Sequence, residues 1–147
     1  MITGEIKWKV DRLWTTFWNN GISNPLSIIE QVSYLLFIKQ LDDLELVEKS
    51  GGKPIFSREQ QHYRWSYLKN ISDSEEMLRI VRDEVFPFIK NLGKSGENAY
   101  TLHMRDAVFL ITNPSLLSNV VSQIDSIPME DRDISGELYE YMLSKLN

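Results

Sequence analysis

The sequence predicts an all-α protein: a single compact bundle of five or six helices around a central buried helix at about residues 25–49. Two observations lead to this fold class. Apolar residues recur at helical spacing in several separate stretches, and residues that favour helix ends, chiefly Asn, Ser, Gly and Pro, stand between those stretches. The 147 residues, 42% of them hydrophobic, are enough for one core, and no flexible linker divides them.

The central helix carries the strongest apolar signal in the chain. Asn24 and Pro25 favour a helix start, because Asn can cap the first free N–H groups and Pro suits the first turn. The run Tyr34–Ile38 advances about 100° per residue, so its apolar side chains cover the whole circumference and must be buried. A Ser-Gly-Gly sequence at 50–52 is expected to end the helix. Before it, three acidic side chains are expected at the solvated surface: Asp42, Asp43 and Glu45.

A first helix is predicted at about residues 6–18, where apolar residues form one stripe: Val10, Leu13, Trp14, Phe17 and Trp18. Gly21 should follow in a left-handed conformation and turn the chain back, so that the first and central helices form an antiparallel pair. Three of the four tryptophans lie in this first helix, and we expect them to fill the core against residues 34–38: Trp8, Trp14 and Trp18.

Shorter helix signals follow residue 52. Ser57–Gln60 has the spacing of a capping box and predicts a helical turn, whereas residues 62–68 fit either an extended segment or a loop across the helices. Ser72–Glu75 is a second capping box, and Pro87 predicts a kink or break in the third helix near Val85 and Phe86. The inner stripe of this helix comprises Met77, Leu78, Val81, Val85, Phe88, Ile89 and Leu92.

Two further helices are predicted in the last third of the chain. Residues 99–111 fit a helix and an extended connector equally well. Asn113 and Pro114 repeat the start signal and open a fourth helix with the stripe Leu116, Leu117, Val120, Val121 and Ile124. An acidic turn, expected to be solvated, carries Glu130, Asp131 and Asp133. A last helix is predicted at about residues 135–146, with the stripe Leu138, Tyr139, Met142 and Leu146.

Composition narrows the range of functions. The net charge of −5 argues against a general nucleic-acid coat. The absence of cysteine excludes disulfides and thiolate metal sites, and it agrees with a reducing compartment. No stretch approaches the roughly 20 apolar residues of a membrane span, and the polar N-terminus lacks a secretory pattern. We therefore expect a cytoplasmic protein without membrane contact.

No residue pattern predicts a catalytic, cofactor-binding or metal site. Glu59 and His62 have the Glu-x-x-His spacing of di-iron bundles, but the second pair that such sites need is missing, since no acidic residue stands three positions before His103. No glycine-rich phosphate loop is present. Asn113-Pro114 is similar to the start of the Asn-Pro-Pro-Phe motif of amino-methyltransferases, but the second proline and the aromatic residue are missing, and a helix start explains the pair.

The one distinctly basic window is 51–70, where Lys53, Arg58, Arg64 and Lys69 stand against Glu59, a net charge of +3. Cations can contact phosphates, and the interleaved aromatic side chains can stack on exposed bases. The alternative is a loop whose aromatic residues pack on the bundle while its cations stay solvated. The candidate DNA contacts are Arg58, Arg64, Trp65 and Lys69, with Lys90 and Lys94 next.

Several segments, spread in order over nearly the whole chain, resemble the helical N-terminal domain of the modification subunit of type I restriction–modification enzymes. These segments are Leu13-Trp14, Gly21–Pro25, Glu30–Asp42, Tyr63-Arg64-Trp65, Val85–Phe88 and Asp133–Leu146. The resemblance implies a parent protein in which this domain precedes a Rossmann-like domain that binds S-adenosylmethionine and methylates adenine at N6. It also implies assembly of two modification subunits with one specificity subunit, which reads the DNA sequence, and with a restriction subunit that adds cleavage.

The resemblance transfers no catalytic residue to this sequence. The chain stops at Asn147, about where the catalytic domain of the family would begin, so we expect residues 1–147 to be the helical domain alone, without a cofactor site. The implied partners are its own catalytic domain, the specificity subunit, the second modification subunit, the restriction subunit and double-stranded DNA held by the assembly.

Two classes of function remain, and the last helix separates them. A module that contacts other subunits should expose part of its last apolar stripe, so Leu138, Tyr139, Met142 and Leu146 are the candidate interface residues. A free-standing helical protein–protein interaction module that shares the fold should have a polar last helix instead.

Overall fold

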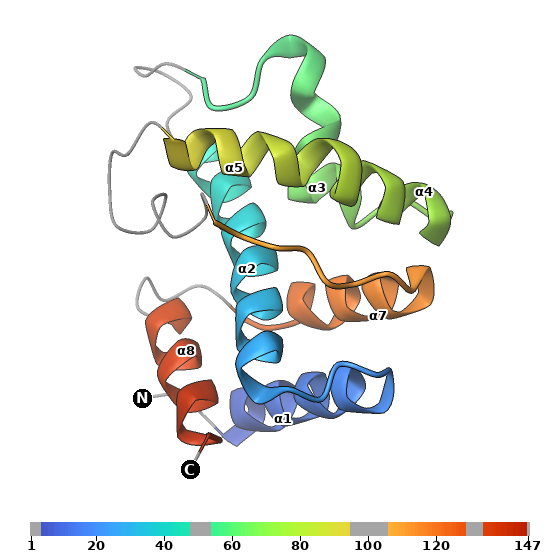
Figure 1. The fold of residues 1–147 in the computed structure, drawn as a ribbon. Coiled ribbons are helices and arrows are strands. Elements are labelled where there is room, and N and C mark those ends of the chain that lie inside the picture. The colour runs from blue at the N-terminus through green and yellow to red at the C-terminus, as the bar shows by residue number, and fades with distance from the viewer. Residues whose placement is uncertain (1–3, 48–53, 95–105, 129–133, 147) are drawn as a thin grey trace.

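The computed structural model of the chain describes residues 4–47, 54–94, 106–128 and 134–146, which are helical without a strand (Figure 1). The all-α prediction is confirmed. The α-helices are α1 (Gly4–Asn19), α2 (Pro25–Val47), α3 (Trp65–Leu68), α4 (Ser74–Ile80), α5 (Phe86–Lys94), α7 (Pro114–Asp125) and α8 (Ile134–Ser144). A 3-10 helix, η1 (Arg58–Tyr63), and a π-helix, η2 (Val81–Val85), complete the set.

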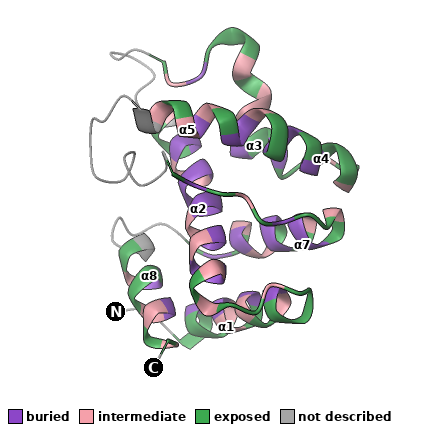
Figure 2. Ribbon diagram, viewed as in Figure 1, coloured by how far each residue is buried: buried purple, intermediate pink, exposed green. Residues whose placement is uncertain are grey.

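Helix α2 runs through the middle of the molecule, with α3, α7 and α8 packed against it (Figure 1). The side-chain oxygen of Asn24 accepts hydrogen bonds from Leu26 N and Ser27 N, as the start signal predicts. Residues 34–38 are all buried, which confirms the apolar belt (Figure 2). The described part of the helix ends at Val47, so the predicted Ser-Gly-Gly stop lies outside the described residues.

Helix α1 packs mainly on α7 and α8 through a buried stripe of Ile6, Val10, Leu13 and Phe17. The predicted antiparallel pairing with α2 is wrong, because α2 rises steeply away from α1 after the turn at Gly21, which has a φ of 93° (Figure 1). The prediction that all three tryptophans fill the core is also wrong. Trp8 and Trp18 are 59% and 53% exposed, and Trp8 stands about half a turn around the helix from the buried Phe17.

Residues 62–63 and 65–68 are helical and only Arg64 between them is extended, so the extended and loop alternatives are both wrong. The capping box predicted at Ser57 is present, and Ser57 N donates to Gln60 Oε1 over 3.0 Å. It starts η1, and the chain turns at Arg64 directly into α3, where Trp65 and Leu68 are buried. The alternation of aromatic and polar residues left an extended segment and a loop equally open, but it belongs to two short helices that meet at Arg64.

The α4, η2 and α5 segments follow one another without a break, so Pro87 does not interrupt the helix. The wider π-helical turn before Pro87 accommodates the proline ring and the absence of a proline N–H group. Phe86 N donates to Val81 O in this turn. The residue that caps α4 is Asp73, whose side chain accepts from Glu75 N, so the prediction of Ser72 is off by one position.

Helix α7 begins as predicted, with the Asn113 side chain accepting bonds from Ser115 N and Leu116 N, and its predicted stripe is buried. Residues 107–113 form a connector without regular helix, and residues 99–105 lie outside the described residues. The acidic turn at 129–133 lies outside them as well.

Among the described helices, none is long and apolar enough to cross a membrane.

Candidate functional site

The basic segment, here residues 54–70, is fixed to the bundle by acidic side chains. Asp42 lies on α2, is 4% exposed, bonds the Arg64 guanidinium through Oδ1 and accepts from Ser66 N over 2.9 Å through Oδ2. The expectation of a solvated Asp42 is therefore wrong. The sequence showed a polar side chain after an apolar run, but burial of that carboxylate depends on a cation 22 positions away.

A second carboxylate of α2 holds the start of the same segment. Glu45 Oε2 accepts from Phe56 N over 2.8 Å, and Oε1 accepts from Ile55 N over 3.3 Å. Glu45 is half-buried and thus differs from the solvated surface residue that the sequence predicted, whereas Asp43 is exposed as expected. The backbone N–H groups of Ile55 and Phe56 thus find their acceptor on α2 and not within the basic segment.

The far end of the segment is held by α7. The indole Nε1 of the buried Trp65 donates to Asp125 Oδ1 over 2.9 Å, and Lys69 Nζ lies 3.4 Å from both carboxylate oxygens of Asp125. The Lys69 and Asp125 side chains are about one-third exposed, so this ion pair is accessible to solvent ions.

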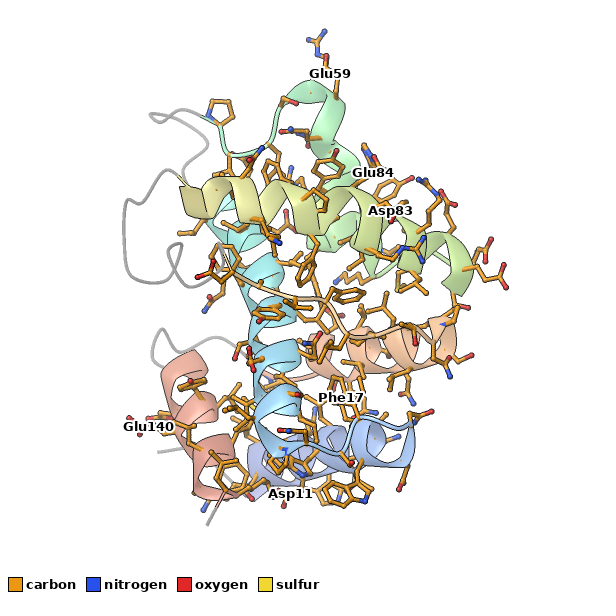
Figure 3. All side chains as sticks on the ribbon, in the orientation of Figure 1. Asp11, Phe17, Glu59, Asp83, Glu84 and Glu140 are labelled. Carbon is orange, nitrogen blue, oxygen red and sulfur yellow. The ribbon has the colours of Figure 1, made fainter. Side chains whose placement is uncertain are left out.

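On the outer side, the segment meets the π-helix through a small charged network. Glu84 lies 2.9 Å from His62 Nε2 and 3.0 Å from Arg79 Nη1, and Arg79 also bonds Glu76 (Figure 3). The hydrogen bond from His62, together with those from Arg79 and against a smaller effect of burial, holds the pKa of Glu84 below its ordinary value. Glu84 therefore stays ionised and joins η1 to η2.

The six candidate DNA contacts fall into three groups. Trp65 already uses its one side-chain donor inside the molecule, and Arg64 uses its Nε and Nη1 groups there. Arg58 is exposed and contacts no acidic group among the described residues, Lys69 has only the exposed Asp125, and Lys90 is half-buried on α5. The side chain of Lys94 lies outside the described residues. The contact of these residues with DNA stays a prediction.

The predicted interface stripe on α8 is split by the fold. Leu138 and Met142 are each 1% exposed and pack into the core, whereas Tyr139 and Leu146 are 43% and 44% exposed. The half-buried Tyr141 fixes α8 to α1, because its hydroxyl donates to Asp11 Oδ1 over 2.8 Å. Burial raises the pKa of Tyr141, and the Asp11 carboxylate raises it further.

Lys145 completes the attachment of α8. Its Nζ lies 2.7 Å from Asp11 Oδ1 and close to the rings of Trp14 and Tyr141. Burial would raise the pKa of Asp11, but the bonds from Lys145 and Tyr141 outweigh it and lower this pKa. One face of α8 is thus bound to α1, and Tyr139 and Leu146 remain for other contacts.

Sequence reasoning missed the polar clamp between α2 and the connector. Gln31 is 2% exposed, its Nε2 donates to Val108 O and its Oε1 accepts from Leu110 N, both over 3.0 Å. Nearby, burial raises the pKa of Tyr34 to about 12, and the bonded Glu30 adds to this shift. A glutamine inside an apolar helical run was the signal, because a buried amide requires partners.

The Asn-Pro pair at residues 113–114 starts helix α7. The side chain of Asn113 is occupied in capping α7, so this residue does not present an amide to a flipped adenine. Across the described ranges, no group of three His, Asp or Glu side chains could hold a metal ion.

Comparison with known proteins gives one finding. Residues 6–124 match the family model described as the HsdM N-terminal domain, which covers most of the chain from α1 to α7. No curated protein and no solved structure gives a significant match.

Proposed function

The chain belongs to the HsdM N-terminal domain family, the N-terminal domain of the modification subunit of type I restriction–modification systems, and from this premise we propose that it is a non-catalytic module that contacts other subunits and helps to enclose DNA. The observation that carries the proposal is the split stripe of α8. Tyr139 and Leu146 are exposed beside the buried Leu138 and Met142, and the Tyr141 hydrogen bond and the Lys145 ion pair, both to Asp11, hold this end of the chain in place. A rigid helix with exposed apolar side chains suits an interface.

The proposal assigns partners as follows. The exposed face of α8 contacts the catalytic domain of the same subunit, and the remaining surfaces contact the specificity subunit, the second modification subunit and, in the full complex, the restriction subunit. We assign S-adenosylmethionine binding and adenine-N6 methylation to the parent protein and not to residues 1–147. A cytoplasmic location is part of the same proposal. A free-standing interaction module is the second candidate, but the apolar residues exposed on α8 favour the first.

The α8 interface can be tested in the full-length modification subunit. Tyr139→Lys with Leu146→Lys should leave the melting temperature of the isolated chain almost unchanged, because both side chains are exposed. In the full-length subunit the same pair should detach α8 from the catalytic domain, since two buried charges would have no partner. The undocked domain should then lower the yield of assembled complex at least about tenfold. Size-exclusion chromatography with the specificity subunit measures assembly.

The matched control is Leu44→Lys, which places a charge on an exposed leucine of α2. It should assemble normally. Assembly of the α8 double variant at the level of the wild type would contradict the proposed interface, and an equal loss in Leu44→Lys would show that added charge alone disturbs the complex.

The basic segment provides the DNA-facing edge in this proposal. Arg58 and Lys69 are the exposed cations with which it would contact phosphates, whereas Arg64 and Trp65 fix its shape. In the assembled enzyme, Arg58→Ala with Lys69→Ala should weaken binding to specific and random duplexes alike. The slope of log K against log salt should become shallower by about one unit per lost contact.

The control for charge is Arg12→Ala with Arg82→Ala, which removes two exposed cations from α1 and η2. Fluorescence anisotropy at several salt concentrations compares the two double variants. An unchanged slope in the Arg58/Lys69 variant, or an equal change in both variants, would contradict the assignment of DNA contact to this segment. Lys90 and Lys94 would then be the next candidates.

A further inference from the structure

Asp125, the last residue of α7, holds two donors of the basic segment at once. Its Oδ1 accepts from the indole Nε1 of Trp65 over 2.9 Å, and Lys69 Nζ lies 3.4 Å from both Oδ1 and Oδ2. Trp65 is 3% exposed, whereas the side chains of Lys69 and Asp125 are about one-third exposed. One carboxylate therefore has a buried partner and a solvent-accessible partner on the same segment.

The two contacts of Asp125 differ in strength. The indole bond has an ordinary length, while both Lys69 distances exceed the usual upper limit of about 3.2 Å for an N–H···O bond. An ion pair between exposed side chains gains little free energy, and the lysine ammonium stands on a flexible stem of four carbons. Lys69 can therefore leave Asp125, while the indole bond keeps the carboxylate in place.

The helix that carries Asp125 does not explain its negative charge. A carboxylate at the C-terminus of a helix lies at the negative end of the macrodipole, and the last turn of α7 has no basic residue to offset it. The Trp65 indole needs only an oxygen acceptor, which a neutral amide would also supply. Among the described residues, Lys69 is the cation that pairs with this carboxylate, from 56 positions away along the chain. The negative charge of Asp125 therefore acts on Lys69.

We propose that Asp125 is an internal competitor for the DNA phosphate: it holds Lys69 in the absence of DNA and releases it when DNA binds. This inference rests on the proposed DNA-facing role of the basic segment. A carboxylate and a phosphate both offer anionic oxygens to an ammonium group, so Lys69 gives up one partner to gain the other. Loss of the internal pair reduces the net gain from the phosphate contact. The Trp65 bond persists during this exchange and keeps the basic segment in one shape.

The test is a double-variant cycle in the assembled enzyme, with the affinity for a DNA duplex measured by fluorescence anisotropy at one fixed salt concentration. Asp125→Asn is nearly isosteric and keeps an oxygen for the Trp65 indole, so the melting temperature of the isolated chain should change little. This variant should raise DNA affinity about two- to fivefold, the range that corresponds to the free energy of an exposed ion pair. In a Lys69→Ala background the gain from Asp125→Asn should be clearly smaller, because the cation that Asp125 holds has been removed.

Glu59→Gln is the matched control, since it removes one negative charge from an exposed position on η1 of the same segment (Figure 3). Its effect on DNA affinity should be equal in the wild-type and Lys69→Ala backgrounds, because a general effect of charge is additive.

Three results would contradict the competitor role of Asp125. An Asp125→Asn gain of equal size in both backgrounds would show simple repulsion of DNA, and the absence of any gain would show that Asp125 does not restrain Lys69. Both results would overturn the inference and leave the proposed function standing, provided that Lys69→Ala alone weakens DNA binding. If Lys69→Ala leaves the affinity unchanged, Lys69 does not contact DNA, and its assignment to the DNA-facing edge is overturned together with the inference.

Discussion

Arg64→Ala should lower the free energy of unfolding by about 3–5 kcal/mol, which is the usual cost of leaving one partner of a buried ion pair alone. The carboxylate of Asp42 is 4% exposed, and the Arg64 guanidinium is its only cationic partner among the described residues. Without Arg64 the Asp42 charge remains buried, and the hydrogen bond from Ser66 N alone does not offset the free-energy cost of that burial. Urea unfolding monitored by circular dichroism measures the loss.

Two further variants separate the buried charge from other effects. Asp42→Asn added to Arg64→Ala should recover part of the stability, because it removes the charge and keeps an oxygen for Ser66 N. Lys69→Ala, which removes a cation from an exposed pair on the same segment, should cost less than about 1 kcal/mol. If the Arg64 and Lys69 variants are equally stable, the Asp42–Arg64 pair does not anchor the segment.

The second large effect is expected in the apolar belt of α2. Leu36→Ala should lower the free energy of unfolding by about 2–5 kcal/mol, because Leu36 is 4% exposed and its removal leaves a cavity between packed helices. Leu44→Ala is the matched control, since it deletes the same atoms from the same helix at a position that is 48% exposed. It should cost less than about 0.5 kcal/mol.

Denaturant melts of both variants measure the difference directly. A cost of similar size at the two positions would mean that α2 is rotated about its axis relative to the structure. A small cost at Leu36 with a normal cost in other core variants, such as Phe17→Ala, would mean that the surrounding side chains collapse into the cavity.

Much of the helical framework was predictable because its signals are local. Asn24 and Asn113 each cap a helix with their own side chain, within three residues along the chain. The belt at residues 34–38 needs no knowledge of its neighbours, since a helix that is apolar on every side has to be covered. The match to the HsdM N-terminal domain supports the family that the sequence resembles.

The sites were less predictable because their chemistry joins distant residues. Asp42 and Arg64 are 22 positions apart, and Gln31 and Val108 are 77 apart, so no local pattern pairs them. The basic segment looked available for phosphate contacts, but two of its candidates, Arg64 and Trp65, hold the segment to α2 and α7. Apolar composition alone also placed Trp8 in the core, although it is exposed.

The sequence by itself determined that the chain is helical, where its main helices begin, which run of α2 is buried and to which family the chain belongs. The helical properties follow from capping, periodicity and apolar content, which act over a few residues. The family follows instead from the resemblance of whole segments, and the family model matches residues 6–124. Only the tertiary structure decided that Asp42 and Glu45 bind the basic segment, that half of the α8 stripe is buried against the bundle and that Gln31 holds the connector at residues 107–111. The physical reason is that a charge or amide is stable in the interior only beside its partner, and the fold alone brings the partners together.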